Sequence, residues 1–222
     1  MKINFKNDYE LYKQEFKLKN EIFLDRTPII LLIRAMNKLC CEVDTGYFIG
    51  KQTMKVNDLK YNTNKIQLKS YIDKVKETSS VSYLICVCEV YNYLEKIIEL
   101  KTTLIKNKKT YQKATKILTK KKYIENKVFF RRITKEEVHR FSEISGDPNH
   151  IHMGERPVIQ AMLILLLIED YFAIKKIQIK TWDITYINPM EAESDIYIFL
   201  DEEKVLFGIV NNTICFKLSI KI

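Results

Sequence analysis

The amino-acid sequence predicts an α+β protein in which an antiparallel sheet wraps around two central helices. Each half of the 222-residue chain contains one strongly apolar helical run, followed by several stretches in which apolar and polar residues alternate. The order of strand, helix and strands is the same in both halves, although no residue identity connects them. Only five glycines and four prolines occur, which favours long regular elements and tight connections.

The composition is that of an ordinary globular protein with a basic charge. Apolar residues make up 46% of the chain and aromatic residues 11%, and the length suffices for one large core or two cores of about 100 residues each. Lys and Arg number 37 against 28 Asp and Glu, a net charge of +9. This surplus favours anionic partners such as nucleic acid, a membrane surface or phosphate-bearing ligands, but a coding bias towards Lys, Ile, Asn and Tyr explains it equally well.

Cysteine usage and hydropathy predict a reduced cytoplasmic protein. The five cysteines are odd in number and contain no Cys-x-x-Cys pair, and Cys86 and Cys88 alternate within an apolar, strand-like run. Charged residues interrupt positions 1–20, so we expect no secretory signal. The longest apolar run, residues 161–168, is far too short to span a bilayer, so we expect no membrane span.

The first half is expected to form one helix and several strands. Residues 15–19 alternate like a short strand, and Thr27 followed by Pro28 provides an N-cap and a first-turn proline. The helix that follows covers residues 29–41 and is apolar on more than one face. After Gly46 the period changes, which predicts strands at residues 47–59, 65–76, 81–90 and 94–105.

A basic segment separates the two halves. Residues 106–122 contain eight lysines and no acidic residue. Two interpretations remain open, a solvated connector packed lightly on the surface or a docking strip for an anionic carrier. No nucleic-acid motif or stacking platform accompanies the lysines, so we expect no nucleic-acid partner. We divide the chain into residues 1–105, a basic linker at 106–125, and residues 126–222.

The second half repeats the plan. Residues 127–133 read as a strand, and Thr134 with Glu137 forms a capping box that opens a helix ending near Ile144. After Pro157 an intensely apolar helix continues to about Phe172. Strands are expected at residues 175–187, 195–200, 204–210 and 213–222, with hairpin turns at 201–203 and 211–212.

The loop at residues 145–152, Ser-Gly-Asp-Pro-Asn-His-Ile-His, is the candidate site. Gly146 and Pro148 break the chain, which leaves Asp147 and His152 between two apolar segments that can hold them rigidly. A carboxylate and an imidazole so placed can share a water, one taking a proton and the other giving one. The alternative is a polar turn in which the short side chains of Asp147 and Asn149 bond the backbone.

Residues 141–152 resemble the hydratase motif of MaoC-like proteins, the R-specific enoyl-thioester hydratases and related dehydratases. The family pattern is an aromatic residue followed by Ser-Gly-Asp-x-Asn-Pro-Ile-His, and the Asp, Asn and His keep their spacing here. Residues 157–163, Pro-Val-Ile-Gln-Ala-Met-Leu, are similar to the family's Pro-Ile-Val-His-Gly-Met-Leu. The departures are His150 for proline, Ala161 for glycine, and a short connection from His152 to Pro157.

The resemblance implies a double hotdog, in which an N-terminal hotdog domain without the catalytic motif pairs with a C-terminal MaoC-like one. It implies interconversion of 2-enoyl and (R)-3-hydroxyacyl thioesters of CoA or acyl-carrier protein, without cofactor or metal. Asp147 and His152 would be catalytic, Asn149 would orient the dyad or water, and the backbone N–H of Ala161 would meet the thioester oxygen.

The same resemblance places the acyl chain between the paired domains, in a monomeric double hotdog or a homodimer. Arg34, Asn37 and Lys38, on the helix of the first half, would then be structural or rim groups. Two other functions remain open: a non-catalytic hotdog module that binds an acyl thioester or a partner enzyme, and a hotdog thioesterase.

Overall fold

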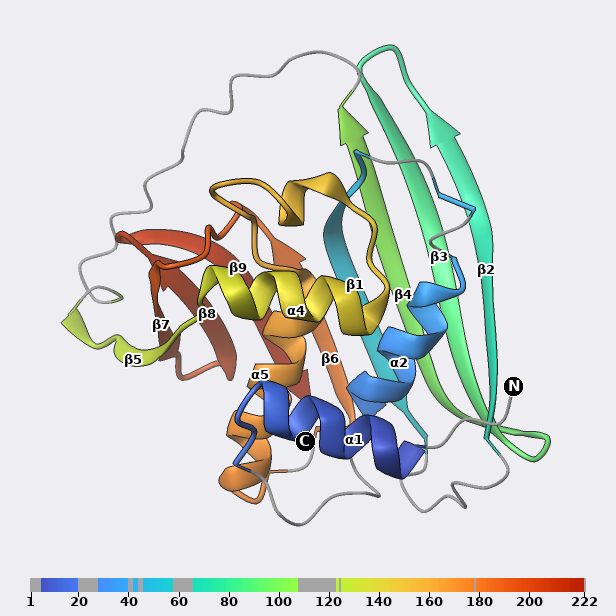
Figure 1. The fold of residues 1–222 in the computed structure, drawn as a ribbon, viewed down its shortest axis with the longest axis horizontal. Helices are drawn as coiled ribbons and strands as arrows, with labels where there is room; N and C mark the ends of the chain where they lie inside the picture. Colours follow the sequence, from blue (N-terminus) through green and yellow to red (C-terminus); the bar gives the residue numbers. More distant parts are fainter. Residues whose placement is uncertain are drawn as a thin grey trace.

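The computed structural model describes residues 5–19, 28–39, 42–43, 46–57, 66–107, 123, 125–177 and 179–221. Within these residues the chain forms one antiparallel sheet of nine strands, in the order β2-β3-β4-β1-β6-β9-β8-β7-β5. Helices lie against one side of this sheet (Figure 1), so the predicted α+β class with a sheet around central helices is confirmed. The strands are β1 (Phe48–Val56), β2 (Ile66–Glu77), β3 (Val81–Asn92), β4 (Glu95–Asn107), β5 (Val128–Arg132), β6 (Thr181–Tyr186), β7 (Asp195–Leu200), β8 (Val205–Val210) and β9 (Thr213–Lys221).

The chain begins with a helix where a strand was expected. α1 covers Phe5–Glu15, so the strand predicted at residues 15–19 is wrong. Tyr9, Tyr12 and Phe16 follow one another at intervals of three and four, and all three are buried. Helical spacing places these rings on one face, whereas the alternation over residues 15–19 is too short to outweigh it.

The central helix of the first half is α2 (Pro28–Asn37), which packs on β2 and β3 (Figure 1). Pro28 is its first residue, as the sequence predicts. Thr27 and residues 40–41 lie outside the described residues. The four predicted strands are present as β1–β4, and β2 continues to Glu77. In the turn that follows, the Thr78 hydroxyl donates to the Val81 carbonyl and accepts from the Val81 N–H. Of the basic segment, only residues 106–107 are described, at the end of β4.

The second half contains α4 (Lys135–Ser145), the short 3-10 helix η2 (His150–His152) and the central helix α5 (Ala161–Ile174). The predicted capping box is present: the Glu137 N–H donates to Thr134 Oγ1 at 3.2 Å, and the Thr134 N–H donates to the Glu137 carboxylate at 3.0 Å. Asn211 and Asn212 both have positive φ, 48° and 59°, as a tight hairpin turn requires.

One strand of the second half starts later than expected. β6 begins at Thr181, so the predicted strand is wrong at the described residues before it, 175–177 and 179–180. Lys175 and Lys176 instead end α5, and Lys176 adopts a left-handed φ of 58°. The N–H of Ile177 then bonds the carbonyl of Phe172, which closes the helix end. No sequence pattern indicates a positive φ at a lysine. The prediction therefore rested on the alternation of apolar and polar residues and started the strand too early.

The two halves meet at β1 and β6. These antiparallel strands pair from Lys51 opposite Thr185 to Lys55 opposite Thr181, and so join the strands β1–β4 to β5–β9 in one sheet. α2 and α5 contact each other on the same side of that sheet. The joint therefore brings the two central helices together.

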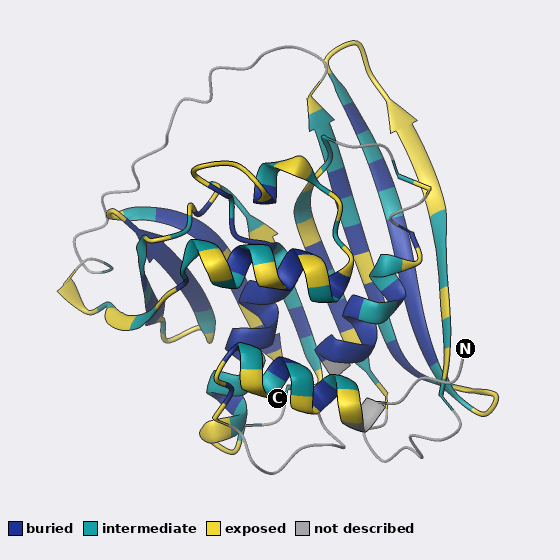
Figure 2. Ribbon diagram, in the orientation of Figure 1, coloured by how far each residue is buried: buried dark blue, intermediate teal, exposed yellow. Residues whose placement is uncertain are grey.

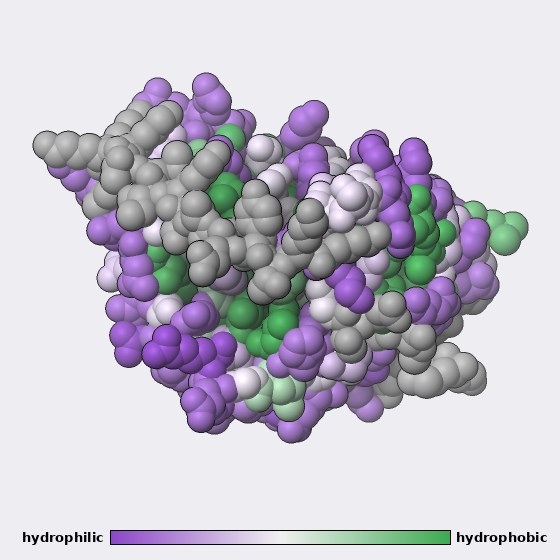
Figure 3. Space-filling model, turned by 90° about the horizontal axis from the view of Figure 1, so that it is seen from above, coloured by the Kyte–Doolittle hydropathy of each residue, from purple (hydrophilic) through white to green (hydrophobic). Residues whose placement is uncertain are grey.

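The core is largest around α5, where residues 162–168 are all buried (Figure 2). Hydrophobic side chains also appear within a largely hydrophilic surface when the molecule is seen from above (Figure 3). No helix in the described part of the chain combines the length and hydropathy needed to cross a membrane.

A carboxyl group is enclosed where α5 meets α2. Glu169 accepts a hydrogen bond from the backbone N–H of Ile29 in the first turn of α2, and its Oε2 atom is buried without a partner among the described residues. Burial is the main cause that raises the pKa of Glu169 well above its ordinary value of 4.5, with Asp170 adding to it. The folded protein therefore favours the protonated form of Glu169.

We predict that Glu169→Gln stabilises the protein at neutral pH. The pKa of Glu169 is higher in the folded state than its ordinary value of 4.5 in the unfolded chain. The wild-type carboxyl group therefore contributes its full stability to the fold below pH 4.5, and this stability is lost as the pH rises towards the folded-state pKa. Glutamine keeps a neutral acceptor for the Ile29 N–H. Urea unfolding at about pH 4 and about pH 8 gives the free energy of unfolding of both proteins. The variant should be more stable relative to the wild type at the higher pH than at the lower one. Glu203→Gln, in an exposed turn, is the control, and an equal difference at both pH values would contradict the prediction.

Candidate active site

The candidate loop starts at a helix end whose backbone conformation favours glycine. Gly146 ends α4 with a left-handed φ of 70°, and its N–H bonds the carbonyl of Ser142. A Cβ at this position would also lie 2.5 Å from Nδ2 of Asn37 on α2. The loop therefore approaches the Asn37 side chain of the first half immediately before Asp147, and a side chain at residue 146 would displace the Asn37 amide.

Asn149 fixes the carboxylate and anchors the loop. Its backbone N–H donates to Oδ1 of Asp147 at 3.0 Å, and its side-chain Nδ2 donates to the carbonyl of Tyr47 at 2.9 Å. The expectation was that the amide itself would orient the dyad or water. In the structure the backbone of Asn149 holds the carboxylate, while the amide ties the loop to the first half.

His152 lies in η2 and is 6% exposed. Its Nδ1 is 2.5 Å from the carbonyl oxygen of Val158, which can only accept, so Nδ1 carries the proton. Nε2 then faces Oδ2 of Asp147 across 3.5 Å. This separation is longer than a good hydrogen bond, and both atoms are acceptors when the imidazole is neutral. A water molecule, which has two hydrogens, can donate to both atoms and satisfy them together.

Burial sets the charge of this imidazole. Desolvation lowers the pKa of His152 below its ordinary value of 6.5, against the opposing influence of the Asp147 carboxylate and the Val158 carbonyl. The imidazole is therefore neutral at neutral pH, with the Nε2 lone pair available as a base. His150 is exposed, and His139 lies on α4, so His152 alone of the three contributes its ring to this site.

The start of α5 offers backbone donors beside the dyad. Gln160 occupies the N-cap position but makes no side-chain cap; its Nε2 donates to the Val138 carbonyl at 2.9 Å and to Ser142 Oγ at 2.7 Å. The N–H groups of Ala161 and Met162 belong to the first turn and have no partner within the helix. Both residues line the same cavity as Asp147 and His152.

The structure brings all four predicted site residues, Asp147, Asn149, His152 and Ala161, to one cavity of about 860 Å³. The cavity lies between the halves. Apolar side chains of the first half form much of its wall, among them Ile33, Met36, Leu39, Ile49, Cys86 and Leu104. A space of this size, mostly apolar with a few convergent polar groups, suits an extended apolar ligand with one reactive polar end.

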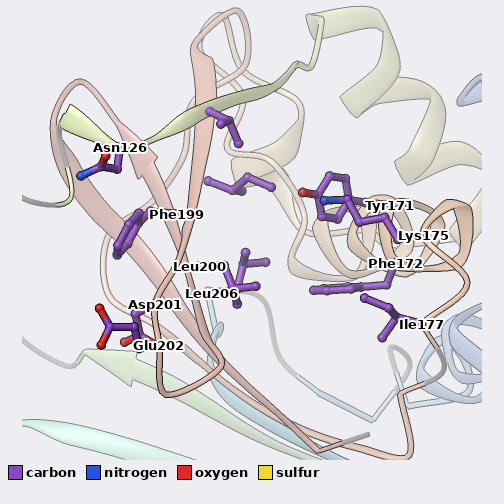
Figure 4. A pocket seen from close by; sticks show the side chains of 12 residues that line it. Asn126, Tyr171, Phe172, Lys175, Ile177, Phe199, Leu200, Asp201, Glu202 and Leu206 are labelled. Carbon is purple, nitrogen blue, oxygen red and sulfur yellow. The ribbon is translucent and has the colours of Figure 1, made fainter.

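A smaller hollow of about 550 Å³ lies elsewhere, between the end of α5 and the strands β5, β7 and β8 (Figure 4). Tyr171, Phe172 and Phe199 contribute aromatic rings to it, and Asp201 and Glu202 lie at its edge. It contains none of the predicted site residues. The chemistry of the dyad belongs to the larger cavity.

The polar groups of α2 fall into different roles. Arg34 pairs with Asp8 of α1 at 2.5 Å and Lys38 donates to the Leu68 carbonyl at 3.1 Å, which agrees with structural and rim positions. Asn37 instead lines the cavity beside Gly146. Tyr186, which also lines the cavity, was missed because a tyrosine at the end of an alternating strand reads as ordinary packing.

Within the described ranges, no three His, Cys, Asp or Glu side chains gather as a metal ion would need. The polar groups of the cavity include a carboxylate, one imidazole, amides, serine and tyrosine hydroxyl groups, and backbone N–H groups. They suit proton transfer and the binding of a carbonyl oxygen.

No protein-family model matches the sequence, and a comparison with curated proteins gives no significant match. Solved structures do resemble it. HtdX from Mycobacterium tuberculosis is 13% identical with a TM-score of 0.67, over 100% of this chain and 97% of that one. A protein described as a MaoC-like dehydratase is 10% identical with a TM-score of 0.70, over 97% and 94% of the two chains. An acyl-ACP thioesterase from Bacteroides thetaiotaomicron is 10% identical with a TM-score of 0.60, over 90% and 92%.

At these identities the likeness shows the fold and leaves the activity open. The neighbours match nearly the whole chain, so both halves take part in it. The chain therefore has the double-hotdog fold that the motif resemblance predicted.

Proposed function

We propose that the protein is a hydratase or dehydratase of the MaoC-like family that interconverts 2-enoyl and (R)-3-hydroxyacyl thioesters. The observation that carries this proposal is the dyad: a neutral Nε2 of His152 and Oδ2 of Asp147, 3.5 Å apart, at the wall of a large apolar cavity. The carrier would be CoA or acyl-carrier protein. The reaction needs no cofactor, because addition of water is an acid–base reaction.

The dyad's geometry supports a defined proton path. A water that donates to both Oδ2 and Nε2 loses one proton to the dyad while its oxygen bonds the β-carbon of the enoyl group. The electron pair of the carbon–carbon double bond moves towards the thioester oxygen. The α-carbon then takes a proton from the dyad, which restores its starting charge. Run backwards, the same steps remove water from a 3-hydroxyacyl thioester.

The enolate-like oxygen requires donors that are in place before the reaction. The free N–H of Ala161 at the start of α5, aided by the positive end of the helix dipole, supports this role. Ala161 is half-buried, and its methyl group stands where the family has a hydrogen atom. His150, which replaces the family's proline, is exposed and absent from the cavity wall, so it adds no second base there.

We further propose that residues 1–105 form a hotdog domain that supplies the acyl wall, with a linker at 106–125 and the catalytic domain at 126–222. The apolar wall residues of α2, β3 and β4 support this division of labour. A protein of this composition, with an odd number of cysteines and no Cys-x-x-Cys pair, suits the cytoplasm, as a monomeric double hotdog or a homodimer. A non-catalytic module that only holds an acyl thioester would need the cavity but not the dyad.

Hydrolysis of a thioester is the competing reaction, since an acyl-ACP thioesterase shares this fold. The dyad argues for hydration. Its two acceptors are tied to one loop, 3.5 Å apart, where they can share a single water. Measuring free thiol release beside loss of enoyl absorbance separates the two reactions.

We predict that Asp147→Asn and His152→Ala each lower the hydration of crotonyl-CoA about a hundredfold or more, because one water must contact both groups. His150→Ala is the matched control: it removes an exposed imidazole from the same loop and should leave turnover unchanged. Enoyl absorbance gives the rate, and circular dichroism confirms folding. Near-normal turnover in either dyad variant would refute the mechanism.

The pH dependence of hydration should report His152. Nε2 accepts a proton only from the neutral imidazole, so kcat/KM should fall as the pH drops through the His152 pKa. Burial lowers that pKa, so the acid limb should have its midpoint below 6.5. Initial rates on crotonyl-CoA across the pH range test this. A midpoint above 6.5 would show that the carboxylate, and not burial, dominates the imidazole.

A further inference from the structure

Two polar side chains are fully buried at the joint between the halves. Gln52 of β1 is paired with Thr102 on the neighbouring strand β4, and the two residues are 0% and 1% exposed. Gln52 Nε2 lies 3.2 Å from Thr102 Oγ1 and 3.2 Å from the sulfur of Met162 in α5. Burying an amide costs free energy unless its groups are hydrogen-bonded. An apolar side chain would fill this space without that requirement, which indicates that the polar groups of Gln52 have a role beyond packing.

Tyr186 connects this pair to the start of α5. Its hydroxyl lies 3.2 Å from Gln52 Oε1 and 3.2 Å from the carbonyl oxygen of Ala161. A phenol carries one proton, so Tyr186 donates to only one of these oxygens at a time. Burial raises the pKa of Tyr186 well above 10.0, so that proton is present at all physiological pH values.

The carbonyl of Ala161 shares its peptide group with the N–H of Met162, which has no acceptor within α5 because it lies in the first turn. An N–H that donates to a negative oxygen makes the carbonyl of its own peptide a better acceptor. The reverse also holds: a hydrogen bond to the carbonyl makes the N–H a stronger donor. A proton from Tyr186 on the Ala161 carbonyl therefore strengthens Met162 N–H as charge develops on a bound thioester oxygen.

We propose that Tyr186 is a positioning residue that acts through the peptide between Ala161 and Met162, making the Met162 N–H a second donor to the thioester oxygen. This inference rests on the proposed hydratase function. In the resting site the Tyr186 hydroxyl can donate either to Gln52 or to the Ala161 carbonyl. In the transition state it donates to the Ala161 carbonyl. The interaction is then stronger in the transition state than in the ground state, so it acts on kcat more than on KM.

Two variants separate this role from simple packing. Tyr186→Phe and Gln52→Met both remove the bond between Tyr186 and Gln52, so a purely structural role of that bond predicts that both variants lower kcat. The proposed role predicts opposite effects. Tyr186→Phe should lower kcat for crotonyl-CoA about tenfold, less than loss of an oxyanion donor itself, with KM little changed. Gln52→Met removes the competing acceptor, so it should keep or raise kcat. Tyr197→Phe, on β7, is the control for loss of a phenol.

A spectroscopic measurement reads the thioester oxygen directly. In an Asp147→Asn background, bound 2,4-hexadienoyl-CoA should absorb at longer wavelength than the free ligand, because donors polarise its carbonyl. Adding Tyr186→Phe should reduce this red shift, whereas adding Gln52→Met should preserve it. Equal kcat and equal shifts in the two variants, with an active wild type, would overturn this inference alone. A wild type that hydrates no enoyl-CoA would overturn the proposed function and this inference with it.

Discussion

The pairing of β1 with β6 is the constraint on which the rest of the structure depends. It runs from Lys51 opposite Thr185 to Lys55 opposite Thr181, and Asp183 bonds both Lys51 and Thr53 across it. Because this pairing makes one sheet from two, the helices α2 and α5 meet on the same face and leave the cavity between them. A sheet edge left unpaired here would expose backbone groups and open the cavity to water.

The polar groups of this cavity are held by backbone atoms from both halves. The Val158 carbonyl fixes the His152 ring, the Asn149 N–H fixes Asp147, and the Tyr47 carbonyl holds the Asn149 amide. Groups placed in advance lose little freedom when a ligand binds, and an apolar wall strengthens each charge interaction among them. The same apolar surroundings keep the imidazole neutral. The contacts that join the two halves thus also fix the positions of Asp147 and His152 and the charge of the imidazole.

The sequence predicted the elements whose signals are local and chemical. Thr134 with Glu137, Pro28 and the Asn211–Asn212 turn each carry their own geometry, and all three are found. The motif identified the loop residues Asp147, Asn149 and His152 from local sequence alone, before the cavity around them was known. What escaped prediction depends on contacts far apart in sequence. The sequence carried helical spacing for α1 in Tyr9 and Tyr12, but contacts such as that of Tyr12 with Phe141 of α4, which bury these rings, are visible only in the folded chain. Gln52 and Tyr186 meet only through the joint of β1 and β6.

The most direct test of the account is incubation of the full chain with crotonyl-CoA, with chiral analysis of the product. One dyad that presents water to one face of a fixed enoyl group should give loss of enoyl absorbance and (R)-3-hydroxybutyryl-CoA, without release of free CoA. Longer enoyl-CoAs should react as well, since the cavity of about 860 Å³ holds more than a four-carbon chain. No loss of absorbance with any chain length, or release of CoA instead, would contradict the account.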